Sequence, residues 1–278
     1  MQLLKKIFDF YIYSNIHVAL AGFCITKITL IKFGNIESYT PYFVGLSIIV
    51  SYNFIRYYEI RTSHLNWFES WFFEYNKIVL SLTSIAAAIL IYITFFTDFD
   101  KRATLVLIPF AFMTFFYVIP LFKIKNIEIS FRNFPSLKIF SICIAWAGIS
   151  VFFPIYEAHS IIDLDVYLEF IQRFLLLIVI ALPFDIRDVR TDPDSLKTLP
   201  QVLGIKATKI VGLVLLLEFV LLELFKQNIS RDNIFILIII AIISGLFLWF
   251  SSKDKTRYYT SFWVESIPII WIGLYMLF

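Results

Sequence analysis

The chain has 278 residues, of which 60% are hydrophobic and 16% are charged, and its mean hydropathy is +0.82. This composition excludes an ordinary soluble domain and is typical of a membrane protein. The net charge of +3 is small, and cytoplasmic anchoring charges explain it better than nucleic-acid binding. We therefore expect the lipid bilayer, and no nucleic acid, as a partner.

Apolar windows poor in charge recur along the whole chain, and each is long enough to cross a hydrocarbon core of about 30 Å as a helix. Only short polar connections separate them, so we expect one all-α integral membrane domain over residues 1–278, with no internal linker. The nine predicted transmembrane helices are 11–31, 40–57, 78–97, 104–122, 137–156, 166–184, 207–226, 234–250 and 261–278.

The distribution of lysine and arginine predicts the orientation. With nine helices and a cytoplasmic amino terminus, 17 of the 24 Lys and Arg residues fall on the cytoplasmic side. Such a bias favours this topology, because positive residues are retained inside. We expect a multi-pass protein of the bacterial inner membrane, with the amino terminus in the cytoplasm and the carboxyl terminus outside.

An acidic stretch follows the sixth predicted helix, where the sequence reads "FDIRDVRTDPDSLKTLPQ". Asp185, Asp188 and Asp192 are spaced by three and then four residues, so a continuing helix would place them on one face. Three carboxylates on one face repel one another, and a cation relieves that repulsion. Oxygen ligands of this kind suit Mg²⁺, which usually takes its remaining ligands from water and substrate phosphates.

Basic residues accompany these aspartates. Arg187, Arg190 and Lys197 could bind the oxygens of the same phosphate groups directly. The alternative is a solvated loop in which acidic and basic side chains pair locally, and the spacing alone leaves both interpretations open.

The order "DIRDVRTD" followed by "KTLPQVLG" resembles the second aspartate-rich motif of the UbiA superfamily of intramembrane prenyltransferases. A glycine that many members carry before the T-L-P segment is absent here. The resemblance implies a bundle of nine helices with a polar mouth on the cytoplasmic side. It also implies Mg²⁺-assisted transfer of an isoprenoid group from a prenyl diphosphate to an aromatic or other hydrophobic acceptor. The matching residues are Asp185, Asp188 and Asp192, as catalytic metal ligands, and Thr198, Leu199, Pro200 and Gly204.

The first motif of that family should follow the second predicted helix, where this sequence reads "YNFIRYYEIRTSH". Asn53 matches the leading asparagine of the motif. Phe54, Tyr57 and Arg61 stand where the family has aspartates, so half of the expected metal site is missing. We expect Asn53, Arg56 and Arg61 to meet the diphosphate, with guanidinium charge standing in for a second metal ion.

A third resemblance follows the fourth predicted helix. Family members often carry a tyrosine and a lysine there, and "YVIPLFK" supplies Tyr117 and Lys123, while Lys138 opens the next helix. We expect all three to bind substrate; the alternative is ordinary anchoring at the membrane interface. The connections 53–64, 117–138 and 185–200 should then meet over one polar mouth.

Two other functions stay open. A catalytically lapsed relative would keep the bundle and bind an isoprenoid lipid, or serve as a membrane partner subunit, and loss of the first motif is what such decay would produce. A transporter is the third possibility, although the interrupted paired helices of inverted repeats are not evident. Within the sixth helix, Glu169 and Arg173 lie one turn apart and should form a structural ion pair.

Overall fold

The computed structural model describes residues 2–34, 37–62, 67–124, 127–132 and 134–278; the side chains of 59–62, 67–70, 122–124 and 127–129 lie outside the description. The described residues are mainly helical, with one short antiparallel hairpin in which Phe122 pairs with Ile129.

Twelve α-helices are found among the described residues, and the hairpin separates the first six from the last six. The first half contains α1 (Gln2–Tyr13), α2 (Ile16–Lys32), α3 (Thr40–Thr62), α4 (Trp67–Glu74), α5 (Asn76–Phe96), α6 (Thr104–Val118), β1 (Phe122–Ile124) and β2 (Ile127–Ile129). The second half contains α7 (Leu137–Glu157), α8 (Leu164–Asp188), α9 (Leu199–Leu203), α10 (Ile205–Leu221), α11 (Arg231–Trp249) and α12 (Ile267–Leu277). A π-helical turn, Tyr259–Val264, precedes α12.

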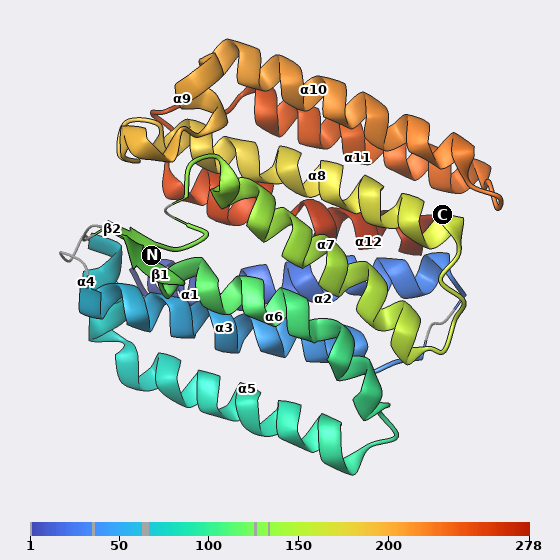
Figure 1. Cartoon of the computed structure of the whole chain (residues 1–278), viewed down its shortest axis with the longest axis horizontal. Helices are drawn as coiled ribbons and strands as arrows, with labels where there is room; N and C mark the ends of the chain where they lie inside the picture. The colour runs from blue at the N-terminus through green and yellow to red at the C-terminus, as the bar shows by residue number, and fades with distance from the viewer. Residues whose placement is uncertain (1, 35–36, 63–66, 125–126, 133) are drawn as a thin grey trace.

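The long helices run side by side along one direction (Figure 1). Helix α8 lies between α7 and α10, and α5 lies at the edge of the bundle. The hairpin, α4 and α9 cluster at the end of the bundle that carries the amino terminus, and the carboxyl terminus lies at the opposite end. The end with the amino terminus is therefore where the polar connections gather.

Helix α8 forms the centre of the largest apolar core. Asp163 caps its start by accepting a hydrogen bond from the backbone of Val166 at 3.1 Å, which satisfies one of the free amides of the first turn. Leu176, Leu182 and Ile186 along the helix are fully buried in a core shared with α2, α7, α10, α11 and α12. Close van der Waals packing of such side chains stabilises the association of helices in a bilayer, so α8 is held in a fixed position.

Helices occupy all nine predicted intervals, and in the described part of the chain six helical segments are long and apolar enough to cross a membrane. The bent pair α1 and α2, which meet at 52°, adds a seventh if both form one span. Helix α3 carries polar residues along its second half, and α10 has only 17 residues. The described helices are consistent with a multi-pass membrane protein, while nine spans, the orientation and the type of membrane stay predictions.

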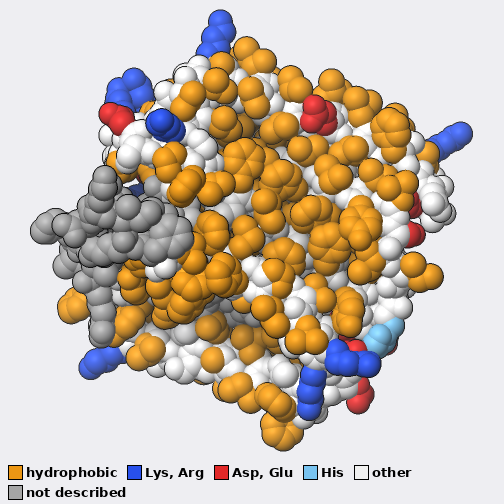
Figure 2. Space-filling model, in the orientation of Figure 1, with side chains coloured by type: hydrophobic (Ala, Val, Ile, Leu, Met, Phe, Trp, Pro, Cys, Tyr) orange, Lys and Arg blue, Asp and Glu red, His pale blue; other side chains and the backbone are white. Residues whose placement is uncertain are grey.

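The outer surface also fits a lipid environment. Figure 2 shows hydrophobic side chains over most of the visible face, with lysine and arginine toward its rim. Large apolar side chains such as Ile85, Phe96 and Leu217 are exposed on α5 and α10. A soluble monomer rarely exposes so continuous an apolar surface, so the exposed faces of these helices are consistent with contact to lipid.

One cluster of charges is buried inside the bundle, toward the first turns of α8. Glu169 contacts Lys32 at 2.6 Å, Lys226 at 2.7 Å and Arg173 at 2.6 Å, which confirms the predicted pair of Glu169 with Arg173. Glu223 adds a second carboxylate, 2.7 Å from Lys226. We call Lys32, Glu169, Arg173, Glu223 and Lys226 the buried ion network, and it ties α2, α8 and the end of α10 together.

Candidate functional site

The three polar connections predicted to meet do lie at one end of the bundle (Figure 1). The backbone amide of Arg132 donates to the carbonyl of Tyr117 at 3.0 Å, so the segment after the hairpin docks on the end of α6. The amide of Ser136 donates to the carbonyl of Leu196 at 2.9 Å. This second bond joins the start of α7 to the connection that follows α8, and it brings Lys138 beside the motif aspartates.

Lys138 bridges two of these aspartates. Its Nζ lies 3.2 Å from Oδ1 of Asp185 and 2.7 Å from Oδ2 of Asp192. Asp185 is only 4% exposed, and burial of a carboxylate without a partner would be costly. The ammonium group of Lys138 therefore supplies the charge that makes the burial of Asp185 tolerable.

The third aspartate is held by its neighbour in sequence. Nε and Nη2 of Arg187 each lie 2.7 Å from an oxygen of Asp188, in a two-bond arrangement typical of strong guanidinium–carboxylate pairs. Arg187 also donates to the hydroxyl of Thr260, in the π-helical turn before α12. Helix α8 ends at Asp188, so Asp192 lies in the following turn and not on the same helical face.

Further cationic side chains lie near the motif aspartates. Arg56 on α3 has Tyr117, Glu265 and Arg187 among its electrostatic neighbours, and Tyr117 interacts in turn with Asp185. We call the whole group the polar cluster; its members are Arg56, Tyr117, Arg132, Lys138, Asp185, Arg187, Asp188, Asp192, Arg257 and Glu265. Its five cations outnumber its four carboxylates, so it is suited to an anion.

Arg132 and Arg257, which lie in connections between helices, also favour a bound anion. Burial, and then the nearby guanidinium of Arg56, lower the pKa of Arg132. Burial, and then the guanidinium of Arg187, lower the pKa of Arg257. A lowered pKa means that the charged form is disfavoured by its surroundings, so an anion bound beside either arginine would be favourable.

Two predicted site residues, Asn53 and Lys197, make no described contact with the polar cluster, and the side chains of two others lie outside the description. The side-chain amide of Asn53 accepts from Asn15 at 2.7 Å and donates to Thr83 at 3.0 Å, so it links neighbouring helices. Lys197 is exposed, and no ion pair among the described residues joins its ammonium group to the aspartates. The side chain of Lys123 lies outside the described residues, as does that of Arg61.

Sequence reasoning missed Arg132, Arg257 and Glu265 as members of the site. Glu265 directly follows the π-helical turn, and its backbone amide donates to the carbonyl of Thr260 at 3.2 Å. Turns of this kind are frequent at functional sites, and a charged residue inside an apolar helix was the one signal in the sequence. The two arginines had no such signal, because basic residues in cytoplasmic connections are expected in any membrane protein.

The aspartates do not fit Mg²⁺ in this arrangement. No group of three or more His, Cys, Asp or Glu side chains is placed to hold a metal ion anywhere in the described part of the chain. Lys138 and Arg187 already occupy the aspartate oxygens. The role of the aspartates as metal ligands stays a prediction.

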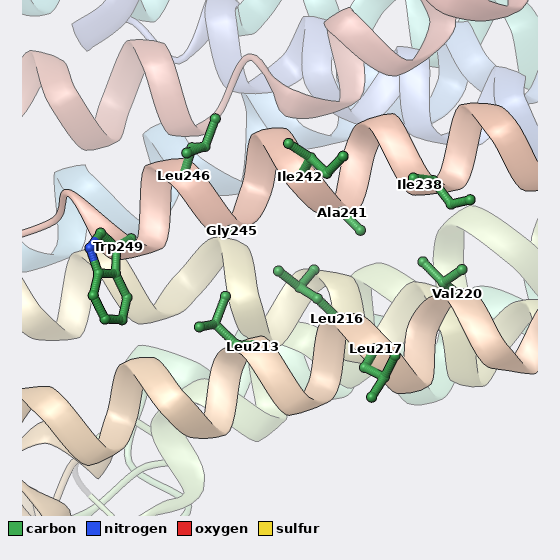
Figure 3. A pocket seen from close by; sticks show the side chains of 10 residues that line it. All are labelled: Leu213, Leu216, Leu217, Val220, Ile238, Ala241, Ile242, Gly245, Leu246 and Trp249. Atoms are coloured by element: carbon green, nitrogen blue, oxygen red, sulfur yellow. The ribbon is translucent and has the colours of Figure 1, made fainter.

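A second concave feature lies on the outer surface, between α10 and α11 (Figure 3). It has a volume of about 570 Å³, and none of its lining side chains is ionisable. A specific binding site normally has a few polar groups that fix the orientation of its ligand, so we place the candidate site at the polar cluster. The groove is lined by Leu213, Leu216, Leu217, Val220, Ile238, Ala241, Ile242, Gly245, Leu246 and Trp249.

No family model, no curated protein and no solved structure matches this chain.

Proposed function

We propose that this protein is a membrane-embedded prenyltransferase that binds the diphosphate of an isoprenoid donor at the polar cluster. The observation that carries the proposal is the convergence of five cationic side chains at one end of an apolar helical bundle. A diphosphate is a compact polyanion, and arginine is the side chain best suited to bind phosphate oxygens through two hydrogen bonds. The motif "DIRDVRTD" with its T-L-P tail supports the same donor class.

The chemistry follows from the position of the charges. When the bond between C1 of the isoprenoid and the diphosphate oxygen breaks, negative charge develops on the leaving group. Arg56, Arg132 and Arg257 stabilise that charge if they surround it, because preorganised cations act strongly where water is excluded. The allylic cation left behind forms a new bond to a hydrophobic acceptor, which then loses a proton. The apolar helices shield the cation from water.

The decisive experiment is incubation of the purified protein, in lipid nanodiscs, with radiolabelled prenyl diphosphates of several chain lengths. We expect binding of at least one of them and release of diphosphate when a hydrophobic acceptor is present. Failure of every chain length to bind would contradict the proposal.

One observation favours a second candidate, a protein that binds isoprenoid diphosphates and has lost catalysis. All three motif aspartates are paired with basic side chains of the chain itself, as expected of carboxylates that stabilise a site and take no part in a reaction. This candidate predicts saturable binding of the same labelled donors without diphosphate release under any condition. The same incubation therefore separates the two functions.

A further inference from the structure

The ammonium group of Lys138 lies between two carboxylates of the acidic motif. Its contacts to Asp185 and Asp192, at 3.2 and 2.7 Å, come from two different segments, the last turns of α8 and the connection after it. The side chain of Lys138 is 19% exposed, and that of Asp185 is 5% exposed. A cation bridging two acidic side chains in this way takes the role that a divalent ion has in a carboxylate site, since it cancels their repulsion and fixes their positions.

A metal ion and this lysine compete for the same oxygens. Mg²⁺ requires oxygen ligands at about 2.0–2.1 Å in near-octahedral geometry. The carboxylates of Asp185 and Asp192 are instead held at ion-pair distances around one nitrogen, and Asp188 is engaged by two nitrogens of Arg187. To bind Mg²⁺ the site would have to break these pairs and leave two cations without their carboxylates, which is costly where the groups are poorly hydrated.

We propose that Lys138 takes the place of the divalent cation in this protein, so that an isoprenoid diphosphate binds to the polar cluster without Mg²⁺. This inference rests on the proposed function, because it concerns the same site and the same donor. A lysine ammonium group has three N–H donors. Two of them point to Asp185 and Asp192, and the third is left for a phosphate oxygen. The guanidinium groups of Arg132 and Arg257 provide the remaining positive charge.

The bridging arrangement also explains how aspartates can be kept in an anion site. Carboxylates beside a diphosphate would repel it if they carried their full charge. Paired with Lys138 and Arg187, the three aspartates position two cations and leave one net negative charge. The three remaining arginines of the polar cluster exceed that charge. The aspartates are then positioning residues, and the basic side chains contact the ligand.

The test measures binding of farnesyl diphosphate to the full-length protein in nanodiscs, by calorimetry, once with excess EDTA and once with saturating Mg²⁺. For the unmodified protein we expect dissociation constants that agree within about threefold, a difference of well under 1 kcal/mol. A requirement of the unmodified protein for Mg²⁺ would overturn the inference while leaving the proposed function standing. Absence of binding under both conditions would instead overturn the proposed function.

The variant Lys138→Met sharpens the result. It removes the ammonium group and frees Asp185 and Asp192, so we expect affinity in EDTA to fall by at least about tenfold, with partial recovery in Mg²⁺. Lys138→Arg keeps the charge and should retain binding in EDTA. The matched control is Lys253→Met, which removes one exposed lysine outside the polar cluster and should bind as the unmodified protein does. Equal affinities of Lys138→Met and the control would contradict the inference.

Discussion

Two clusters of charge differ in how they are built. The buried ion network gathers the side chains of Lys32, Glu169 and Lys226, each at most 5% exposed. In the polar cluster, the paired side chains of Lys138, Arg187 and Asp192 remain about one-fifth exposed, and two of the arginines come from loops. In the buried ion network the charged groups pair with one another inside the protein, whereas the polar cluster keeps charged groups accessible to a ligand.

The two clusters are also far apart. Glu169 and Asp185 lie on the same helix, sixteen residues from each other, and a rise of 1.5 Å per residue separates them by roughly 24 Å. Helix α8 therefore connects a structural anchor with the candidate site. Changes at one end should affect stability and changes at the other should affect binding, and the following predictions test this division.

The largest effect is expected for Glu169→Gln. The substitution removes the carboxylate charge shared by Lys32, Arg173 and Lys226. Arg173 then loses its carboxylate partner, and the two lysines share the single charge of Glu223. Breaking a buried ion pair in this way typically costs about 3–5 kcal/mol. Thermal unfolding in detergent, followed by circular dichroism, should show a much lower midpoint. Glu218→Gln is the matched control, because Glu218 is exposed on α10, and its midpoint should not fall.

An effect of intermediate size is expected for Arg56→Ala. Loss of one guanidinium from the polar cluster should weaken binding of farnesyl diphosphate by about 1.5–3 kcal/mol, the range for a hydrogen bond to a charged group. The midpoint of thermal unfolding should change little by comparison. Arg102→Ala, which removes an exposed arginine paired with Asp100, is the control and should leave binding unchanged. Equal losses of binding affinity in both variants would contradict a specific role of Arg56, because the overall charge of the protein would then explain the weaker binding.

A smaller effect of opposite sign is expected for Glu265→Gln. Glu265 interacts with Arg56 and Arg187. In its ionised form, which an alkaline buffer favours, its carboxylate competes with a bound anion for their positive charge. Its neutralisation in that buffer should tighten binding of farnesyl diphosphate by about 1 kcal/mol, the interaction of two unit charges roughly 4 Å apart in water. Titration calorimetry would detect this as a roughly fivefold lower dissociation constant. Weaker binding would place Glu265 in direct contact with the ligand.

Composition and periodicity located the helices because those signals are local: an apolar window of sufficient length has few alternatives in a bilayer. The pairs that define the site are not local. Lys138 and Asp192 are 54 residues apart, and Lys32 and Glu169 are 137 apart, so nothing in the spacing identifies them as partners. Asn53 matched a motif position, yet its amide is used by Asn15 and Thr83, which only the packing of helices could reveal.

The smallest effect on folding and on binding is expected for Asp188→Asn. Whether binding weakens or strengthens in this variant distinguishes a metal ligand from a partner of Arg187. If Asp188 were a metal ligand, as the motif resemblance implies, its loss should abolish both Mg²⁺ dependence and donor binding. In the structure Asp188 instead engages Arg187 through two bonds, with its side chain 30% exposed. Exposed ion pairs contribute about 0–1 kcal/mol, so folding should be nearly unchanged.

The same substitution frees Arg187 for the ligand. Neutral asparagine holds the guanidinium less strongly than a carboxylate does, so farnesyl diphosphate should bind as well as before or up to about 1 kcal/mol more tightly, with or without Mg²⁺. Asp185→Asn is the contrasting variant, since Asp185 is buried and positions Lys138, and it should weaken binding. Two results together would instead identify Asp188 as a metal ligand. The unmodified protein would require Mg²⁺ for binding, and Asp188→Asn would fail to bind even when Mg²⁺ is added.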